Sequence, residues 1–183
     1  MHFRYETERL SLQVLNENNA SGTLEFYSRG SSIFNLVEPA KPADFYSMGY
    51  QRILLRGEYE SFLNGNYMRY YFTTLENPDI IIGTASFSHI DRGVYCSCIL
   101  GYKLLPEYHK HGYAIEALAA LISAVFSEEH IHRIEAFVLP DNKPSIRLLK
   151  RLGFMCEGVA HSVIRLNNGF VDHLRYVLIN PLD

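Results

Sequence analysis

The residues best suited to do chemistry lie in one short segment, where a strand-like stretch runs through a glycine turn into an amphipathic helix. The turn reads His109-Lys110-His111-Gly112-Tyr113-Ala114. Backbone N–H groups at a helix start lack intrahelical acceptors and carry partial positive charge, so they bind phosphate groups. Gly112 permits close approach of the backbone, and Lys110 and His111 add positive charge. The segment therefore predicts a site for a phosphorylated cofactor, although an ordinary surface loop would explain the glycine in isolation.

Paired histidines and cysteines raise the question of a metal site. The pair His109-x-His111 lies in the phosphate turn and His130-x-His132 at a helix-to-strand junction, and neither has Asp, Glu or Cys at ligand spacing. The spacing Cys96-x-Cys98 is not that of a structural zinc pair. The sequence therefore predicts no bound metal, and we expect Cys96, Cys98 and Cys156 to be free thiols in the core.

Composition and charge limit the possible classes of function. The chain has 183 residues, of which 48% are hydrophobic and 20% charged, as expected for one globular domain over residues 1–183. A net charge of −3 gives no general attraction to nucleic acid or to an anionic membrane. The sequence has no long apolar run and no signal-peptide pattern at its start. We therefore expect a cytoplasmic protein that binds neither nucleic acid nor a membrane.

The first half of the chain predicts a strand, two helices and then a group of strands. Residues 7–15 alternate as a strand does, and weaker polar and apolar patterns predict helices near 17–30 and 44–64. Three stretches rich in aromatic and branched residues follow, separated by turn residues, and they predict an antiparallel meander over 67–75, 80–89 and 94–102.

The second half predicts a parallel crossover and a final hairpin. Apolar residues recur at helical spacing over 112–129 and alternate over 134–138, so strand, helix and strand imply a parallel pair. Asn142 can cap a short helix that Gly153 ends. Strands at 154–165 and 170–179 surround the turn Asn167-Asn168-Gly169. The sequence thus predicts an α+β fold with a mixed, mostly antiparallel twisted sheet of about seven strands flanked by helices.

In order and spacing, these motifs resemble the GCN5-related N-acetyltransferase (GNAT) superfamily, in particular its ribosomal-protein-alanine acetyltransferase (RimJ/RimL-like) branch. The resemblance covers nearly the whole chain. Its strongest pieces are Gly101-Tyr102-Lys103-Leu104-Leu105-Pro106, His109 to Ala114, Glu116-Ala117-Leu118, His132-Arg133-Ile134-Glu135-Ala136, Asn142-Lys143-Pro144-Ser145 and Leu152-Gly153-Phe154 with Glu157-Gly158, together with Thr7-Glu8-Arg9-Leu10 and Asp172-His173. Two positions depart from the family signature, because His109 stands where Arg or Gln is usual and Lys110 stands where a small or flexible residue is frequent.

The resemblance implies that acetyl-CoA is the cosubstrate and that residues 109–114 bind its pyrophosphate through their backbone amides. It implies that the strand ending at Leu104 and Leu105 separates from the strand ending near Leu139, so that pantetheine lies in the wedge between them. The backbone N–H near Leu105 would polarise the thioester carbonyl. Apolar side chains at Leu104 and Leu105 are also what any buried strand would show.

The resemblance also implies roles for two residues at the start of the short helix. Asn142 would position the pantetheine and Ser145 would protonate the leaving sulfur, although helix capping would explain both residues. The carboxylate base usual in the family is missing from 94–105 and from 159–166. Because imidazoles titrate near neutral pH, His161 and His173 are the candidate catalytic bases, with His89 or a water chain as alternatives.

The amine acceptor is the least determined part of the reaction. At pH 7, deprotonating a lysine side chain costs about 4 to 5 kcal/mol, whereas an α-amine costs only about 1 kcal/mol. A weakly equipped site therefore favours a protein or peptide N-terminal α-amine, acetylated directly because no cysteine looks activated.

Several alternatives remain at this point. A small-molecule acceptor, such as an aminoglycoside or a polyamine, would be favoured by an acidic cleft, and a non-catalytic acyl-CoA-binding module would explain the missing carboxylate. Eight aromatic residues could line an acceptor cleft or belong to the core: Phe45, Tyr46, Tyr50, Tyr59, Phe62, Tyr67, Tyr70 and Tyr71. An exposed sheet edge would also allow two chains to form a homodimer.

Overall fold

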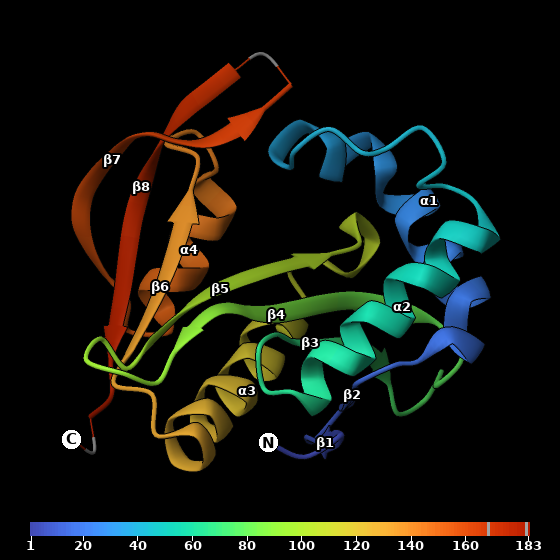
Figure 1. Cartoon of the computed structure of the whole chain (residues 1–183), viewed down its shortest axis with the longest axis horizontal. Coiled ribbons are helices and arrows are strands. Elements are labelled where there is room, and N and C mark those ends of the chain that lie inside the picture. Colours follow the sequence, from blue (N-terminus) through green and yellow to red (C-terminus); the bar gives the residue numbers. More distant parts are fainter. Residues whose placement is uncertain (168, 182) are drawn as a thin grey trace.

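The computed structural model describes residues 1–167, 169–181 and 183, and it is built on one twisted mixed sheet (Figure 1). Within these residues the sheet has eight strands in the order β1-β2-β3-β4-β5-β6-β8-β7. The strands are β1 (Arg4–Glu6), β2 (Leu10–Gln13), β3 (Met68–Thr74), β4 (Ile81–Asp91), β5 (Ser97–Leu104), β6 (Arg133–Val138), β7 (Met155–Leu166) and β8 (Gly169–Ile179). The strand beyond the expected seven is β1, whose three residues are too few to show a periodic pattern.

The helices cover both faces of the sheet, with α1 and α2 on one face and α3 on the other (Figure 1). Their bounds are α1 (Ala20–Val37), α2 (Met48–Leu63), α3 (Tyr113–Glu129) and α4 (Lys143–Arg151), with short 3-10 turns at Glu17–Asn19 and Pro106–Tyr108. The predicted first helix exists, but it begins later and runs further than expected. It ends where Glu38 turns to an extended conformation, φ −119° and ψ 158°, as the residue before Pro39 must.

Two hydrophobic clusters fill the space between the sheet and its helices. Successive side chains of β3 point to opposite faces, so Tyr70 and Phe72 pack in the cluster that includes α3, while Tyr71 packs with α1 and α2. Leu105, just after β5, joins the α1 and α2 cluster and is fully buried. The sheet is therefore anchored on both faces close to the end of β5.

The parallel pairing of β5 with β6 confirms the predicted crossover, but it covers only a short stretch. The two strands are in register at Ser97 with Arg133, Cys98 with Ile134 and Ile99 with Glu135. Beyond these pairs β5 continues beside β4 as far as Leu104, and β6 continues beside β8 as far as Val138. Beyond Ile99 and Glu135, β5 and β6 are not paired with each other. We call the gap between these two strand ends the wedge.

Some local expectations were wrong. Only Cys98 is a core thiol, because Cys96 is partly buried and Cys156 is exposed. Cys96 precedes β5 with φ +41°, which takes it out of the alternation of that strand. Asn168 of the predicted hairpin turn lies outside the described residues, and Gly169 has the positive φ expected there, +123°. Among the described helices, none is both long and apolar enough to cross a membrane.

We expect Gly83→Ala in β4 to destabilise the fold by about 1 to 3 kcal/mol. A Cβ at this position would lie 2.7 Å from Leu104 Cδ1 and 2.8 Å from the carbonyl oxygen of Lys103, so β4 and β5 would have to move apart. Urea unfolding of both proteins measures the difference.

The matched control is Gly57→Ala in the middle of α2, where a Cβ meets nothing within 4 Å. Alanine is the better helix former, so this variant should gain up to about 1 kcal/mol of stability. Equal stability of Gly83→Ala and the parent protein would contradict the close approach of β4 and β5.

Candidate functional site

The turn between β5 and α3 presents a helix start without a side-chain cap. Gly112 is the N-cap residue with φ +84°, and no described side chain accepts a hydrogen bond from the first turn of α3. Lys110 also takes a left-handed conformation, φ +67°, which brings the chain sharply round to the helix. The N–H groups of the first turn therefore have no side-chain acceptor among the described residues, and the binding of a phosphate there stays a prediction.

A brace from the N-terminal region holds this turn in place. The Glu116 carboxylate of α3 accepts hydrogen bonds from Thr7 Oγ1 at 2.6 Å, from Arg9 N at 2.9 Å and from Arg9 Nε at 2.7 Å. Arg9 Nη1 donates to the carbonyl oxygen of His111 at 2.9 Å, and the guanidinium lies 4.8 Å from the centre of the Tyr113 ring. This contact explains the motif Thr7-Glu8-Arg9-Leu10, because its residues tie β2 to the helix start.

His109 has a different role from the one that the turn suggested. Its Nε2 lies 3.0 Å from the carbonyl oxygen of Leu104, to which it donates, and its backbone N–H donates to the carbonyl of Pro106 at 3.0 Å. The backbone amide of His109 is therefore not free to bind a phosphate. Of the predicted phosphate-binding residues, His111, Gly112, Tyr113 and Ala114 surround the uncapped helix start.

The sequence placed the polarising N–H near Leu105, and the N–H of Leu105 itself points away from the wedge. That N–H donates to the carbonyl oxygen of Ile82 in β4 at 2.8 Å. Because N–H groups alternate in direction along an antiparallel strand, those of Leu104 and Tyr102 point away from β4 and toward β6. A carbonyl polarised in the wedge would therefore be polarised by Leu104 or Tyr102.

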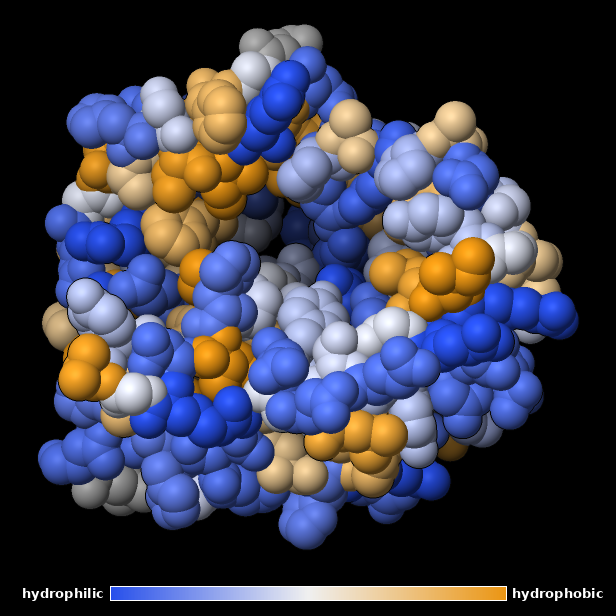
Figure 2. Space-filling model, in the orientation of Figure 1, coloured by the Kyte–Doolittle hydropathy of each residue, from blue (hydrophilic) through white to orange (hydrophobic). Residues whose placement is uncertain are grey.

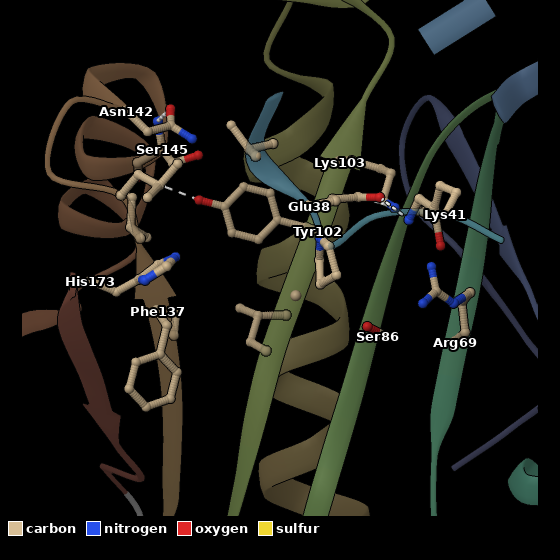
Figure 3. A pocket seen from close by; sticks show the side chains of 18 residues that line it. Glu38, Lys41, Arg69, Ser86, Tyr102, Lys103, Phe137, Asn142, Ser145 and His173 are labelled. Atoms are coloured by element: carbon tan, nitrogen blue, oxygen red, sulfur yellow. Dashed lines mark hydrogen bonds and ion pairs between the residues drawn. The ribbon is translucent and has the colours of Figure 1, made fainter. Parts of the chain in front are cut away.

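A cavity of about 350 Å³ occupies the wedge and extends under the loop between α1 and α2. In the surface view it corresponds to the hollow between the β6–β8 side of the molecule and α1 (Figure 2). Asn142, Ser145 and His173 lie on one side of it and Glu38, Lys41 and Lys103 on the other, with the Tyr102 ring between them (Figure 3). The cavity thus joins the end of β5 to residues from distant parts of the chain.

Asn142 and Ser145 begin α4, and both line the cavity. Asn142 Oδ1 accepts a hydrogen bond from Ser145 N at 3.2 Å, so the expected cap is present. The Tyr102 hydroxyl reaches across the wedge to the carbonyl oxygen of Ser145 at 3.4 Å. Burial raises the pKa of Tyr102 to about 12, so it remains a neutral hydroxyl. Two hydroxyl groups, from Ser145 and Tyr102, therefore face the wedge.

The structure separates the histidines that sequence could not rank. His173 lines the cavity and is only 3% exposed, whereas the His161 side chain is 79% exposed and pairs with Asp172 at 2.8 Å. His89 is exposed and lies 3.2 Å from Ser88 Oγ. His173 Nδ1 lies 3.2 Å from the carbonyl of Val171, so Nδ1 carries the hydrogen. Its Nε2 is then an acceptor when the ring is neutral.

Metal ligation and aromatic lining receive no support from the geometry. Among the described residues, no three His, Cys, Asp or Glu side chains are grouped to hold a metal. The eight aromatic residues that the sequence offered for an acceptor cleft are not among the described residues that line this cavity. Four of them, Phe45, Phe62, Tyr70 and Tyr71, belong to the core. The aromatic groups at the cavity are instead Tyr102 and Phe137.

Sequence reasoning missed the charged side of the cavity. Glu38 contacts Lys103 and lies 2.5 Å from Lys41 Nζ, and the side chains of Arg69 and Ser86 lie on the same side (Figure 3). Burial pushes the pKa of Glu38 upward, but the charges of Lys103 and Lys41 outweigh it and hold this pKa below its usual range. The sequence Glu38-Pro39 could have indicated that α1 ends at Glu38. No neighbouring residue in the sequence indicates that Glu38 contacts Lys103.

Comparisons with known proteins agree with this geometry. The sequence model of a protein family, the acetyltransferase (GNAT) domain, matches residues 9–155. The ribosomal protein uS5-alanine N-acetyltransferase of Escherichia coli K12 is 33% identical over 182 residues, which cover 97% of this chain and 91% of that protein.

Solved structures show the same architecture. The ribosomal-protein-S5-alanine acetyltransferase of Vibrio fischeri superposes with a TM-score of 0.91 at 25% identity, covering 98% of both chains. The RimJ protein of Mycobacterium smegmatis, solved in complex with CoA-disulfide, has a TM-score of 0.86 at 21% identity, covering 93% of this chain and 81% of that one. The family match, the identity along nearly the whole chain and the shared fold show that the chain belongs to the GNAT acetyltransferase family, in its RimJ/RimL-like branch.

Proposed function

We propose that this protein, acting as one catalytic domain, transfers the acetyl group of acetyl-CoA to the α-amine at the N-terminus of a peptide or protein. The observation that carries the proposal is the cavity that joins the open edge of β5 to Ser145 and His173. The Escherichia coli relative, named for an alanine of ribosomal protein uS5, supports an N-terminal acceptor.

The cosubstrate fits the chain at two places. The uncapped start of α3 offers N–H groups and a partial positive charge to the pyrophosphate, with Lys110 and His111 beside it. The N–H groups of Leu104 and Tyr102 offer hydrogen bonds to pantetheine amides and to the thioester carbonyl. Acetyl-CoA supplies the activated acyl group. Asn142, the N-cap residue of α4, orients the pantetheine of acetyl-CoA.

His173 and Ser145 supply the proton transfers that the reaction needs. Nε2 of His173 takes one proton from the acceptor ammonium, which leaves a neutral amine as nucleophile. As the C–N bond forms and the C–S bond breaks, the Ser145 hydroxyl gives its proton to the sulfur and receives one from the amide nitrogen. The products are the acetylated amine, the CoA thiol and the proton held by His173.

The charge of the cavity argues against polycationic acceptors. Among its described lining residues, Lys41, Arg69 and Lys103 are cationic and Glu38 is anionic. An aminoglycoside or a polyamine would bring several positive charges to this surface, whereas a peptide N-terminus brings one. The described lining residues of this cavity therefore do not form the acidic cleft that would favour a polyamine acceptor.

Acetyl-CoA should raise the Tm by several degrees, since a ligand at a hundredfold excess over its Kd contributes about 2.7 kcal/mol. In the same samples, thiol release should depend on peptides with a free N-terminus. The measurement compares them with Nα-acetylated copies, polyamines and aminoglycosides. Stabilisation without thiol release from any amine would instead indicate a binding module, and faster release with polyamines would contradict the peptide acceptor.

Removing the brace with Arg9→Gln should raise the KM for acetyl-CoA about tenfold, the equivalent of about 1.4 kcal/mol, with a smaller change in kcat. The reason is that Arg9 holds Glu116 and the carbonyl of His111, and thereby the position of the helix start. Arg4→Gln is the matched control, because Arg4 is exposed and, among the described residues, its ion pair is with the equally exposed Glu6. Equal KM values for the two variants would refute a role of the brace in cofactor binding.

Ser145→Ala should lower kcat about a hundredfold, the scale of general acid catalysis, and leave the KM for acetyl-CoA nearly unchanged. Tyr102→Phe is the comparison, since its hydroxyl faces the same wedge. Steady-state kinetics with a single peptide acceptor measures both variants. A larger loss of kcat in Tyr102→Phe than in Ser145→Ala would assign the proton donor to Tyr102 instead.

A further inference from the structure

Two lysines share one carboxylate on the α1 and α2 side of the cavity. Lys41 Nζ and Lys103 Nζ both contact Glu38, through Oε2 and Oε1 respectively. The three side chains are 21%, 14% and 16% exposed for Lys41, Lys103 and Glu38. The group is therefore shielded from water. Its two ammonium groups share one carboxylate, so one positive charge has no counter-ion within the group.

The neighbouring charges do not supply the missing anion. Arg69 is paired with Glu58 at 2.8 Å, so that carboxylate is already engaged. Burial lowers the pKa of Lys103 to about 8; Glu38 opposes the shift, and the charges of Arg69 and Lys41 add to it. Tyr27 and Phe34 face the Lys103 ammonium with their rings, 5.2 Å and 5.4 Å to the ring centres, and add no full charge. One more carboxylate would satisfy this group.

We propose that Lys41 and Lys103 form a subsite for a carboxylate of the acceptor, on the opposite side of the cavity from Ser145 and His173. The inference rests on the proposed function and names its substrate class, an amine with a carboxylate a few bonds away. Figure 3 shows the separation that this requires, with the lysines and Ser145 on either side of the Tyr102 ring. Glu38 is the counter-ion of the subsite when no acceptor is bound.

The chemistry has two possible sources, a peptide whose second or third residue is Asp or Glu, or a free acidic amino acid. Both place an amine near His173 while a carboxylate reaches the lysine pair. A lysine ammonium is a compact donor that holds a carboxylate without demanding bidentate geometry, so it tolerates either source. A polar but uncharged side chain at the same place would leave the excess charge unbalanced.

The test compares matched peptides of the form Ala-Asp, Ala-Asn and Ala-Lys followed by the same neutral sequence, with free aspartate and glutamate as further acceptors. Partly buried charged hydrogen bonds contribute about 1.5 to 3 kcal/mol, so kcat/KM for the Asp peptide should exceed that for the Asn peptide at least about tenfold. A preference for the free amino acids over the peptides would identify a small-molecule acceptor of the same class.

Variants assign this preference to the lysine pair. Lys41→Gln should reduce the ratio of Asp to Asn peptide to near one, whereas Lys41→Arg should keep it. Lys150→Gln is the matched control, because Lys150 is exposed in the last turn of α4, and it should leave the ratio unchanged. The thermal shift with acetyl-CoA shows that each variant is folded.

The ratio should also fall as the pH rises from 7 to 9. Lys103, whose pKa burial lowers to about 8, is charged below that pH and neutral above it. Deprotonation of the acceptor amine affects both peptides equally, so it cancels in the ratio. A ratio that stays constant over this interval contradicts a charged Lys103 in the subsite.

Binding provides a readout that does not depend on turnover. Calorimetry with CoA and the acetylated peptides should give tighter binding of acetyl-Ala-Asp than of acetyl-Ala-Asn, and Lys41→Gln should abolish the difference. Selective binding without acetylation of any amine would overturn the proposed function and support the subsite. Acetylation of both peptides with equal kcat/KM and equal product affinity would overturn the subsite and leave the proposed function intact.

Discussion

The structure depends on the parting of β5 and β6 after a short stretch of parallel pairing. A buried N–H without a partner costs about 1 to 3 kcal/mol, so two diverging strands normally demand another chain or water between them. Here the sheet is held together on either side of the gap, by β4 and by β8, and the helices α3 and α1 clamp the end of β5 from both faces. The unpaired edges of β5 and β6 stay apart because the neighbouring strands and helices hold both strands in place. A preorganised site requires such fixed surroundings.

The two ends of the cavity use different physics. At the cofactor end, the recognition that we propose relies on backbone N–H groups, those of a helix start and of a strand, and not on direct side-chain contacts. The side chains there act indirectly, as Arg9, Glu116 and His109 do when they hold the turn and the strand end. At the acceptor end, the recognition that we propose relies on side-chain charges and on the ring nitrogen of His173. Recognition by the backbone suits a cosubstrate that stays the same, and recognition by side chains suits an acceptor that must be selected.

Local patterns predicted most elements because periodicity, capping residues and glycine turns act within a few residues of each other. The helix after Asn142, the crossover and the phosphate turn all have such signals. The strand β1 was missed because three residues carry no period. The donor could be placed near Leu105 but not at one residue, because the direction of an N–H depends on the register with β4, which composition does not encode. Glu38 was missed because its partner Lys103 lies on a distant strand, and only folding brings the two charges together.

The position of Glu38 and Lys41 has an evolutionary consequence. Both lie in the connection between α1 and α2, outside the described strands of the sheet, whereas Lys103 belongs to β5. Loops tolerate substitution and changes of length better than the elements they join. A descendant of this protein could thus acquire a new acceptor by changing one connection while keeping its sheet, its helix starts and its cosubstrate. Divergence of substrates within such a lineage would be concentrated in this connection.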